Sequence, residues 1–264
     1  MPIATLPGII ARPITDAFVW EEVFAKYPAL KNWWTLTKGQ ATADATTGRT
    51  RIAPRIGTLT LDGTGVQPWV ADGGYEAASF AGTQGQPVLG FDTAKLTGRW
   101  TMFSVRKAAA IDTEDWGISL RNSDPSVAEG DGARVFHVAR STAGASQVRG
   151  VLINPAINAL LTYPNAPALN TRDVGFVSFD FTTGAVSGAH GAEAPTSVTY
   201  GRWSELLATG GTVWQWTVGQ GQGNQPFSGS ILDFALIQGD IFDGTAAMNN
   251  LRADLIRYAA TYGA

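Results

Sequence analysis

The chain has 264 residues, of which 44% are hydrophobic and 16% are charged, and its formal net charge is −3. This hydrophobic fraction supports a folded core and excludes global disorder, while 19 Lys and Arg against 22 Asp and Glu, with no basic run, argue against a nucleic-acid-binding protein. Because the chain has no cysteine, disulfides, thiolate metal sites and a cysteine nucleophile are excluded.

Residues 1–14 contain three prolines and show neither a helix nor a strand period. We expect an extended N-terminal arm here. The segment lacks a basic start and Pro7-Gly8 interrupts its apolar run, so we do not expect a signal peptide. No stretch reaches the roughly 20 apolar residues of a membrane span. The sequence therefore predicts a protein made in the cytoplasm with no membrane partner.

A short helix is predicted over residues 16–27. Thr15-Asp16 forms an N-cap pair that places a carboxylate at the positive end of the helix dipole. Pro28 ends the helix because it cannot continue the hydrogen-bond ladder. One apolar stripe with helical spacing follows the cap, formed by Trp20, Val23, Phe24 and Tyr27.

From about residue 33 to 238 the hydrophobic period changes from 3.6 to 2, which is typical of strands. Glycine, proline, asparagine and aspartate separate the runs, and Thr183-Gly184 predicts a tight hairpin turn. Many short strands without helices between them favour an antiparallel sandwich. The clearest runs are Trp100–Arg106, Ala133–Arg140, Gln147–Ile153, Val174–Phe181, Thr212–Val218 and Ser230–Ile237.

The C-terminus returns to a helical period after Asp243-Gly-Thr245. We expect this helix to lay one face on the sandwich through Met248, Leu251, Leu255, Tyr258 and Tyr262. Since no linker or composition break divides the chain, residues 15–264 are predicted to form one domain behind the arm of residues 1–14.

One segment resembles a known family. Trp216-Thr-Val-Gly-Gln-Gly, followed by Pro226-Phe-Ser-Gly-Ser-Ile and a terminal helix, is similar to the closing segment of laminin-G-like modules of the concanavalin A-like lectin/glucanase superfamily. Asn32-Trp-Trp-Thr35 and Val66-Gln-Pro-Trp69 resemble the lead-in of bacterial and phage versions. The likeness covers about residues 32–262. It implies an all-β fold, a two-sheet antiparallel jelly-roll sandwich with a short N-terminal and a C-terminal helix. It also implies ligands on the concave sheet or its rim, sometimes with Ca²⁺.

The residues argue against an enzyme. Hydrolases of this superfamily carry a Glu-x-Asp-x-(x)-Glu strand that places two carboxylates on one sheet face, and this chain has no such strand. Its only histidines, His137 and His190, are too few for a His-rich metal site. We therefore predict no catalytic residue and no required cofactor.

Eight residues are candidates for binding. Asp112, Glu114 and Asp115 could hold Ca²⁺ with oxygen ligands, or they could form a solvated acidic turn. Trp116 and Trp203 could stack on sugar rings, whereas Trp214 and Trp216 share one strand face and read as core, as do Trp20 and Trp100. Arg134 and Arg140 share a predicted strand face with Phe136 and Val138 and could line a groove there. His137, on the face of Val135 and Ala139, is a further candidate, although a packed structural role suits it better.

Two hypotheses from different classes follow. The first is a non-catalytic structural and binding module of a phage-like particle, such as a capsid decoration, head-fibre or tail-associated protein. Its arm would dock on other virion proteins, it could form a homotrimer, and it could also bind cell-surface glycans. The alternative is a free carbohydrate-binding, lectin-like module. A polysaccharide hydrolase is a third possibility that lacks its catalytic strand.

Overall fold

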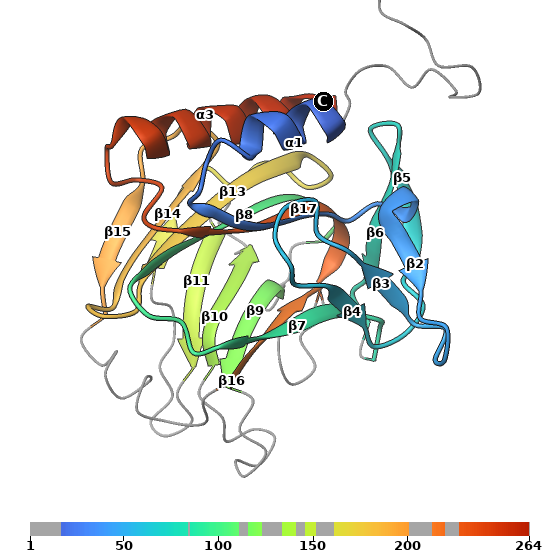
Figure 1. The fold of residues 1–264 in the computed structure, drawn as a ribbon. Helices are drawn as coiled ribbons and strands as arrows, with labels where there is room; N and C mark the ends of the chain where they lie inside the picture. Colours follow the sequence, from blue (N-terminus) through green and yellow to red (C-terminus); the bar gives the residue numbers. More distant parts are fainter. Residues whose placement is uncertain are drawn as a thin grey trace, which may run out of the picture.

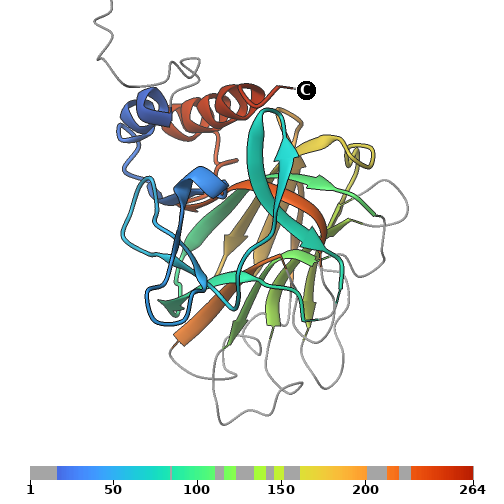
Figure 2. The ribbon, with the colours of Figure 1, turned by 90° about the vertical axis from the view of Figure 1, so that its right-hand side faces the viewer.

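The computed structural model describes residues 17–83, 85–110, 116–122, 134–140, 146–151, 161–200, 213–219 and 227–263. At 17–19, 116, 121–122, 134–140, 147 and 149–151 it describes the backbone alone. Two antiparallel sheets face each other, and two helices lie side by side on the outer face of one of them (Figures 1 and 2). Neither of these helices is long and apolar enough to cross a membrane.

Sheet A contains eight strands in the order β15-β14-β13-β8-β17-β6-β5, with β1 also paired to β17. One edge of β17 runs along β8, while its other edge pairs first with β6 and then with β1. The strands are β1 (Leu30–Thr35), β5 (Trp69–Asp72), β6 (Tyr75–Ala81), β8 (Arg99–Ala108), β13 (Arg172–Asp180), β14 (Ala185–His190), β15 (Thr196–Thr199) and β17 (Ser228–Gln238).

Sheet B contains nine strands in the order β12-β11-β10-β9-β16-β7-β4-β3-β2. A 3-10 turn, η1 (Lys38–Gln40), leads into it. The strands are β2 (Ala41–Ala43), β3 (Thr50–Ile52), β4 (Leu61–Gly63), β7 (Leu89–Ala94), β9 (Trp116–Asn122), β10 (Arg134–Arg140), β11 (Ser146–Val151), β12 (Leu161–Tyr163) and β16 (Val213–Val218).

Aromatic rings fill the space between the sheets. The Trp34 ring stacks on Phe234, with centroids 5.4 Å apart, and tilts against Phe91 at 4.9 Å. Trp214 and Trp216 are 1% and 0% exposed in the same cluster, which confirms their prediction as core residues. Large aromatic side chains bury the most apolar area per residue, so this cluster is the main hydrophobic stabilisation of the sandwich.

A second core lies between sheet A and the helices α1 (Ala17–Phe24) and α3 (Ala246–Ala260). Edge-to-face contacts of 5.0–5.6 Å join Phe24 of α1, Trp33 of β1 and Tyr258 of α3. The Thr245 hydroxyl caps α3 by accepting from the backbone N–H of Met248. Both predicted helices are therefore present, and each packs the apolar stripe expected of it.

The N-terminal helix ends at Phe24 rather than at Tyr27 as predicted. The N–H groups of Lys26 and Tyr27 donate to carbonyls three residues back, so the last turn is not α-helical. Pro28 restricts Tyr27, whose hydroxyl donates to Asp254 of α3 at 2.5 Å. The predicted hairpin turn at Thr183-Gly184 is confirmed between β13 and β14, with Gly184 at φ 76°.

Candidate functional site

The outer face of sheet B, turned away from sheet A, is the first candidate surface. Ile118 and Leu120 of β9 point into the core together with Trp214 and Trp216 of β16. Because side chains alternate along a strand, the positions between these belong to the outer face. The register aligns exposed Asp92, half-buried Gln215 and the backbone of Arg121 in one row across β7, β16 and β9.

The register carries this face onward into β10 and β11. Arg134 lies opposite Arg121, and His137 lies opposite Ser119 of β9 and Arg149 of β11. Backbone pairing thus brings two of the predicted site residues to one surface, beside Arg121 and Arg149, which the sequence reasoning did not select. A sheet face with polar and basic positions at this density can offer several hydrogen bonds to one ligand.

For the remaining predicted site residues the structure describes either the backbone alone or nothing. Arg140 and Trp116 belong to β10 and β9 by their backbones. Trp203 and the acidic trio Asp112, Glu114 and Asp115 lie outside the described residues, as does the arm of residues 1–14. Within the described part of the chain no group of three acidic or histidine side chains could hold a metal ion. The Ca²⁺ site and the tryptophan platforms stay predictions.

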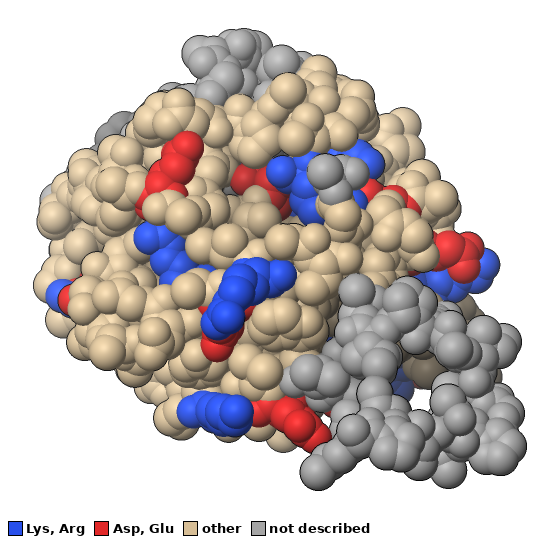
Figure 3. All heavy atoms as spheres, turned by 90° about the horizontal axis from the view of Figure 1, so that it is seen from above, with Lys and Arg blue, Asp and Glu red and all other residues tan. Residues whose placement is uncertain are grey.

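The second candidate is a groove of about 240 Å³ on the helix side of sheet A, here named the Asp72 groove. Asp72 is the last residue of β5, the strand at one edge of sheet A. The groove is lined by Val70, Ala71, Asp72, Ser79, Phe80, Lys107, Ala109, Asn170, Gly229 and Ser230. Charged atoms are sparse on the surrounding face, and Figure 3 shows basic and acidic groups there lying next to each other.

Three donors hold the Asp72 carboxylate. Its Oδ1 accepts from Lys107 Nζ at 3.0 Å and from Arg172 Nη2 at 2.6 Å, and its Oδ2 accepts from the Ser230 hydroxyl at 2.7 Å. Burial alone would raise the pKa of Asp72, but these three donors outweigh it and lower the pKa below its usual range. The carboxylate is therefore ionised at neutral pH and serves as an anchor for two cations.

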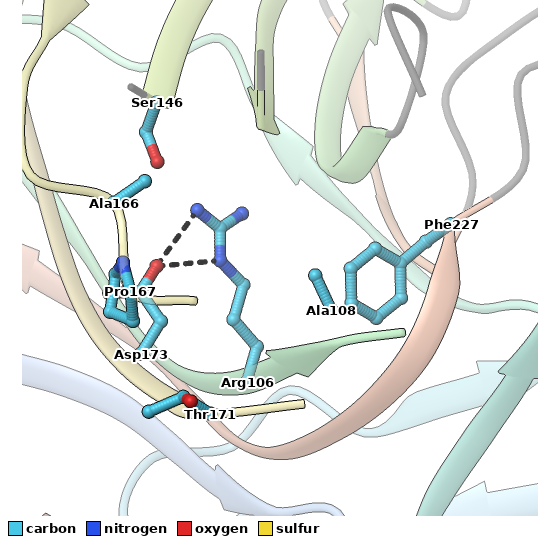
Figure 4. A pocket seen from close by; sticks show the side chains of 8 residues that line it. All are labelled: Arg106, Ala108, Ser146, Ala166, Pro167, Thr171, Asp173 and Phe227. Carbon is cyan, nitrogen blue, oxygen red and sulfur yellow. Dashed lines mark hydrogen bonds and ion pairs between the residues drawn. The ribbon is translucent and has the colours of Figure 1, made fainter. Parts of the chain in front are cut away.

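The third candidate is a small enclosed pocket between the sheets. Arg106, 5% exposed, donates from Nε to Asp173 Oδ2 at 3.2 Å, and His190 Nδ1 lies 2.6 Å from the other carboxylate oxygen. Figure 4 shows the Ser146 hydroxyl turned toward the Arg106 guanidinium, with Phe227 on the opposite wall. A volume of about 10 Å³ accommodates one water molecule and no sugar. We assign this pocket to the stability of the sandwich.

No protein-family model and no curated protein sequence matches the chain. The fold does match solved structures. Domain 4 of AbnA, a GH43 extracellular arabinanase from Geobacillus stearothermophilus, in complex with arabinotriose, is 14% identical, with 87% of this chain and 99% of that one covered and a TM-score of 0.56. The CBM40 of Ruminococcus gnavus IT-sialidase is 14% identical over 67% of this chain and 94% of that one, at a TM-score of 0.49.

Trypanosoma rangeli sialidase in complex with sialic acid matches 86% of this chain at 10% identity and a TM-score of 0.51. This chain spans about a third of the length of that sialidase, since 33% of it is covered. Identities this low establish the fold alone. The two antiparallel sheets, together with the matches at TM-scores of 0.56 and 0.51, confirm the prediction of a two-sheet antiparallel jelly-roll sandwich.

Proposed function

We propose that this chain is a non-catalytic module that binds glycans on the outer face of sheet B. The likeness to domain 4 of AbnA is the observation that carries the proposal, because it extends over nearly the whole of both chains and that domain is in complex with arabinotriose. It supports the lectin-like alternative more directly than the particle role.

The chemistry of the outer face suits a saccharide. Sugar hydroxyls both donate and accept, so a binding surface needs carboxylate, amide and hydroxyl groups at close spacing. Asp92, Gln215 and Thr217 provide these three types on two adjacent strands. The two helices lie on sheet A (Figure 1), so neither of them covers this face.

The buried carboxylates of the Asp72 groove and of the small pocket between the sheets support a non-catalytic role. Asp72 and Asp173 are each held by arginine, and both pKa values are lowered despite burial. A glycosidase needs one of two neighbouring carboxyls to stay protonated as the acid. Neither of these aspartates meets that requirement.

Calorimetric titration of the full chain tests the proposal. We expect saturable binding in a series of arabinotriose, sialic acid and neutral oligosaccharides. Gln215→Ala and Arg134→Ala should each weaken binding at least fivefold. Lys38→Ala, in η1 with its side chain on Glu76 of sheet A, should leave binding unchanged. Trp116→Ala and Trp203→Ala test the predicted stacking platforms in the same series. If the folded protein binds no glycan, or if both outer-face variants bind as the wild type does, the proposal is wrong.

A structural role in a phage-like particle is the second candidate. It rests on the three prolines and missing periodicity of residues 1–14 and on the laminin-G-like resemblance. Such an arm would dock on neighbouring virion proteins in the assembled particle, where a homotrimer is one arrangement. Deleting residues 1–14 should abolish incorporation into particles while glycan binding is retained. Normal incorporation of the truncated chain would contradict this role.

A further inference from the structure

We propose that the Asp72 groove is a second ligand site, specific for a sugar unit that carries a carboxylate, such as a uronic acid. The groove lies on sheet A, on the opposite side of the molecule's core from the outer face of sheet B. The inference does not depend on glycan binding at that other face.

One row of residues forms the floor of the groove. In the register of sheet A, Ser79 of β6 lies opposite Ser230 of β17, Ser230 lies opposite Lys107 of β8, and Lys107 lies opposite Arg172 of β13. The four side chains therefore share one face of four adjacent strands. Asp72, from the hairpin of β5 and β6, reaches over this row and contacts its last three members.

The charges of this row do not balance. Lys107 and Arg172 are cross-strand neighbours of like charge, an arrangement that destabilises a sheet unless anions lie between them. Asp72 supplies one negative charge against two positive ones. The described residues of the groove thus carry an excess of one positive charge, which a ligand carboxylate would neutralise.

Lys107 can reach such a ligand. Its side chain is 30% exposed, whereas that of Asp72 is 2% exposed. An ammonium group has three N–H donors, and one of them points to Asp72. Two donors therefore remain for a ligand, beside a carboxylate that is already fixed in place.

The other groups of the groove suit a sugar ring rather than a bare anion. The Ser79 hydroxyl and the Asn170 amide have no side-chain hydrogen bond within the described part of the chain, and exposed Asn170 is held at φ 59° with its N–H on the Ala108 carbonyl. Val70, 43% exposed, forms an apolar wall. A volume of about 240 Å³ lies just below the range of drug-sized pockets, which fits a single sugar ring.

Nuclear magnetic resonance titration of the full chain with three probes tests the proposal. Sodium glucuronate carries both the ring and the charge, glucose carries only the ring, and sodium acetate only the charge. We expect saturable shifts with glucuronate at resonances of the groove, and at least tenfold weaker binding of glucose and of acetate. If glucose binds as tightly as glucuronate, the groove does not recognise the carboxylate. If acetate binds as tightly as glucuronate, the groove does not recognise the sugar ring. Either result overturns the proposal, as does no binding of glucuronate.

Two variants link binding to the groove. Lys107→Gln removes the positive charge of the ammonium group and should weaken glucuronate binding at least tenfold, while the matched control Lys38→Gln should not change it. Asn170→Ala changes an exposed side chain and should weaken binding severalfold even if Lys107→Gln fails to fold. Arg134→Ala should have no effect here, which separates this site from the outer face of sheet B. If Asn170→Ala and a correctly folded Lys107→Gln both bind glucuronate as the wild type does, the assignment of the site to this groove is wrong.

Discussion

Two buried aspartates lie on opposite faces of sheet A and respond to burial in opposite ways. Asp173 faces sheet B and is 7% exposed, and Asp233 faces the helices and is 0% exposed. Burial tends to raise both pKa values, but the hydrogen bond from His190 and the charge of Arg106 lower that of Asp173. Burial raises the pKa of Asp233 to about 7 because its partners are neutral.

The partners of Asp233 are hydroxyl and indole groups. Its Oδ1 accepts from Trp33 Nε1 and from the Tyr258 hydroxyl, each at 2.9 Å. These bonds lower the pKa, but less than burial raises it. In this sandwich the type of partner, rather than the depth of burial, decides whether a buried carboxylate is charged.

Arg106→Met should give the largest effect, since it leaves Asp173 buried beside His190 alone. Removing one member of a buried ion pair costs about 3–5 kcal/mol. Urea denaturation at pH 7 measures the loss. The double variant Arg106→Met, Asp173→Asn should recover part of it, because no unpaired charge stays buried. A single variant within about 1 kcal/mol of the wild type would contradict the assigned role of the pair.

Asp233→Asn should change the pH dependence of stability. The folded pKa of about 7 lies above the ordinary 3.8, so the folded state binds the proton more strongly. Stability that is present below about pH 4 is therefore lost as the pH rises through 7, by on the order of 4 kcal/mol. Asn cannot ionise, and its denaturation curves at pH 4 and pH 8 should differ by less than those of the wild type. Equal pH slopes for both proteins would show that Asp233 is charged at neutral pH.

Asp72→Asn should act with the opposite sign and a smaller size. The pKa of Asp72 is lowered by its donors, so its contribution is present above about pH 4 and is lost as the pH falls below that value. We expect about 1–2 kcal/mol at pH 7, because Lys107 is partly solvated and Ser230 can still donate to the amide. Thermal unfolding from pH 3 to 7 measures it. A variant that loses stability with acid as steeply as the wild type would contradict this assignment.

Lys38→Ala should change the free energy of unfolding least among these variants. The Lys38–Glu76 pair is 2.8 Å long, but both side chains are more than half exposed, at 55% and 56%. Water and salt screen such pairs, so we expect a change within about 0.5 kcal/mol. A loss above 1 kcal/mol in urea denaturation would mean that exposure is a poor guide to charge energetics in this protein.

The sequence predicts the long strands well and the short ones poorly. Within the described part of the chain, each of the six runs of period 2 overlaps a strand of the structure, including β8, β13 and β17. Strands of three or four residues, such as β2, β4 and β12, are too short to show a period. Their pairing depends on the sheets already being formed, which no local pattern contains.

The Asp72 groove and the small pocket between the sheets could not be predicted from the sequence for a related reason. Asp72, Lys107, Arg172 and Ser230 belong to four different strands, and only the register of sheet A brings them together. One local signal was available, because Arg106 lies four positions after Met102 on the same strand face, and Met102 is buried between the sheets. A charged residue at such a position indicates a buried partner, but the sequence does not name Asp173 as that partner.

The topology also sets the order in which this protein can fold. The central strands of both sheets, β16 and β17, come from the last part of the chain, and Trp33 meets Asp233 200 residues later. Until residues 213–238 have left the ribosome, each sheet exists as two separate halves with open edges. Contacts this distant in sequence form slowly, and open edges can pair with other chains. The nascent protein is therefore exposed to aggregation until residues 213–238 have emerged, and chaperone demand should fall once these strands have paired.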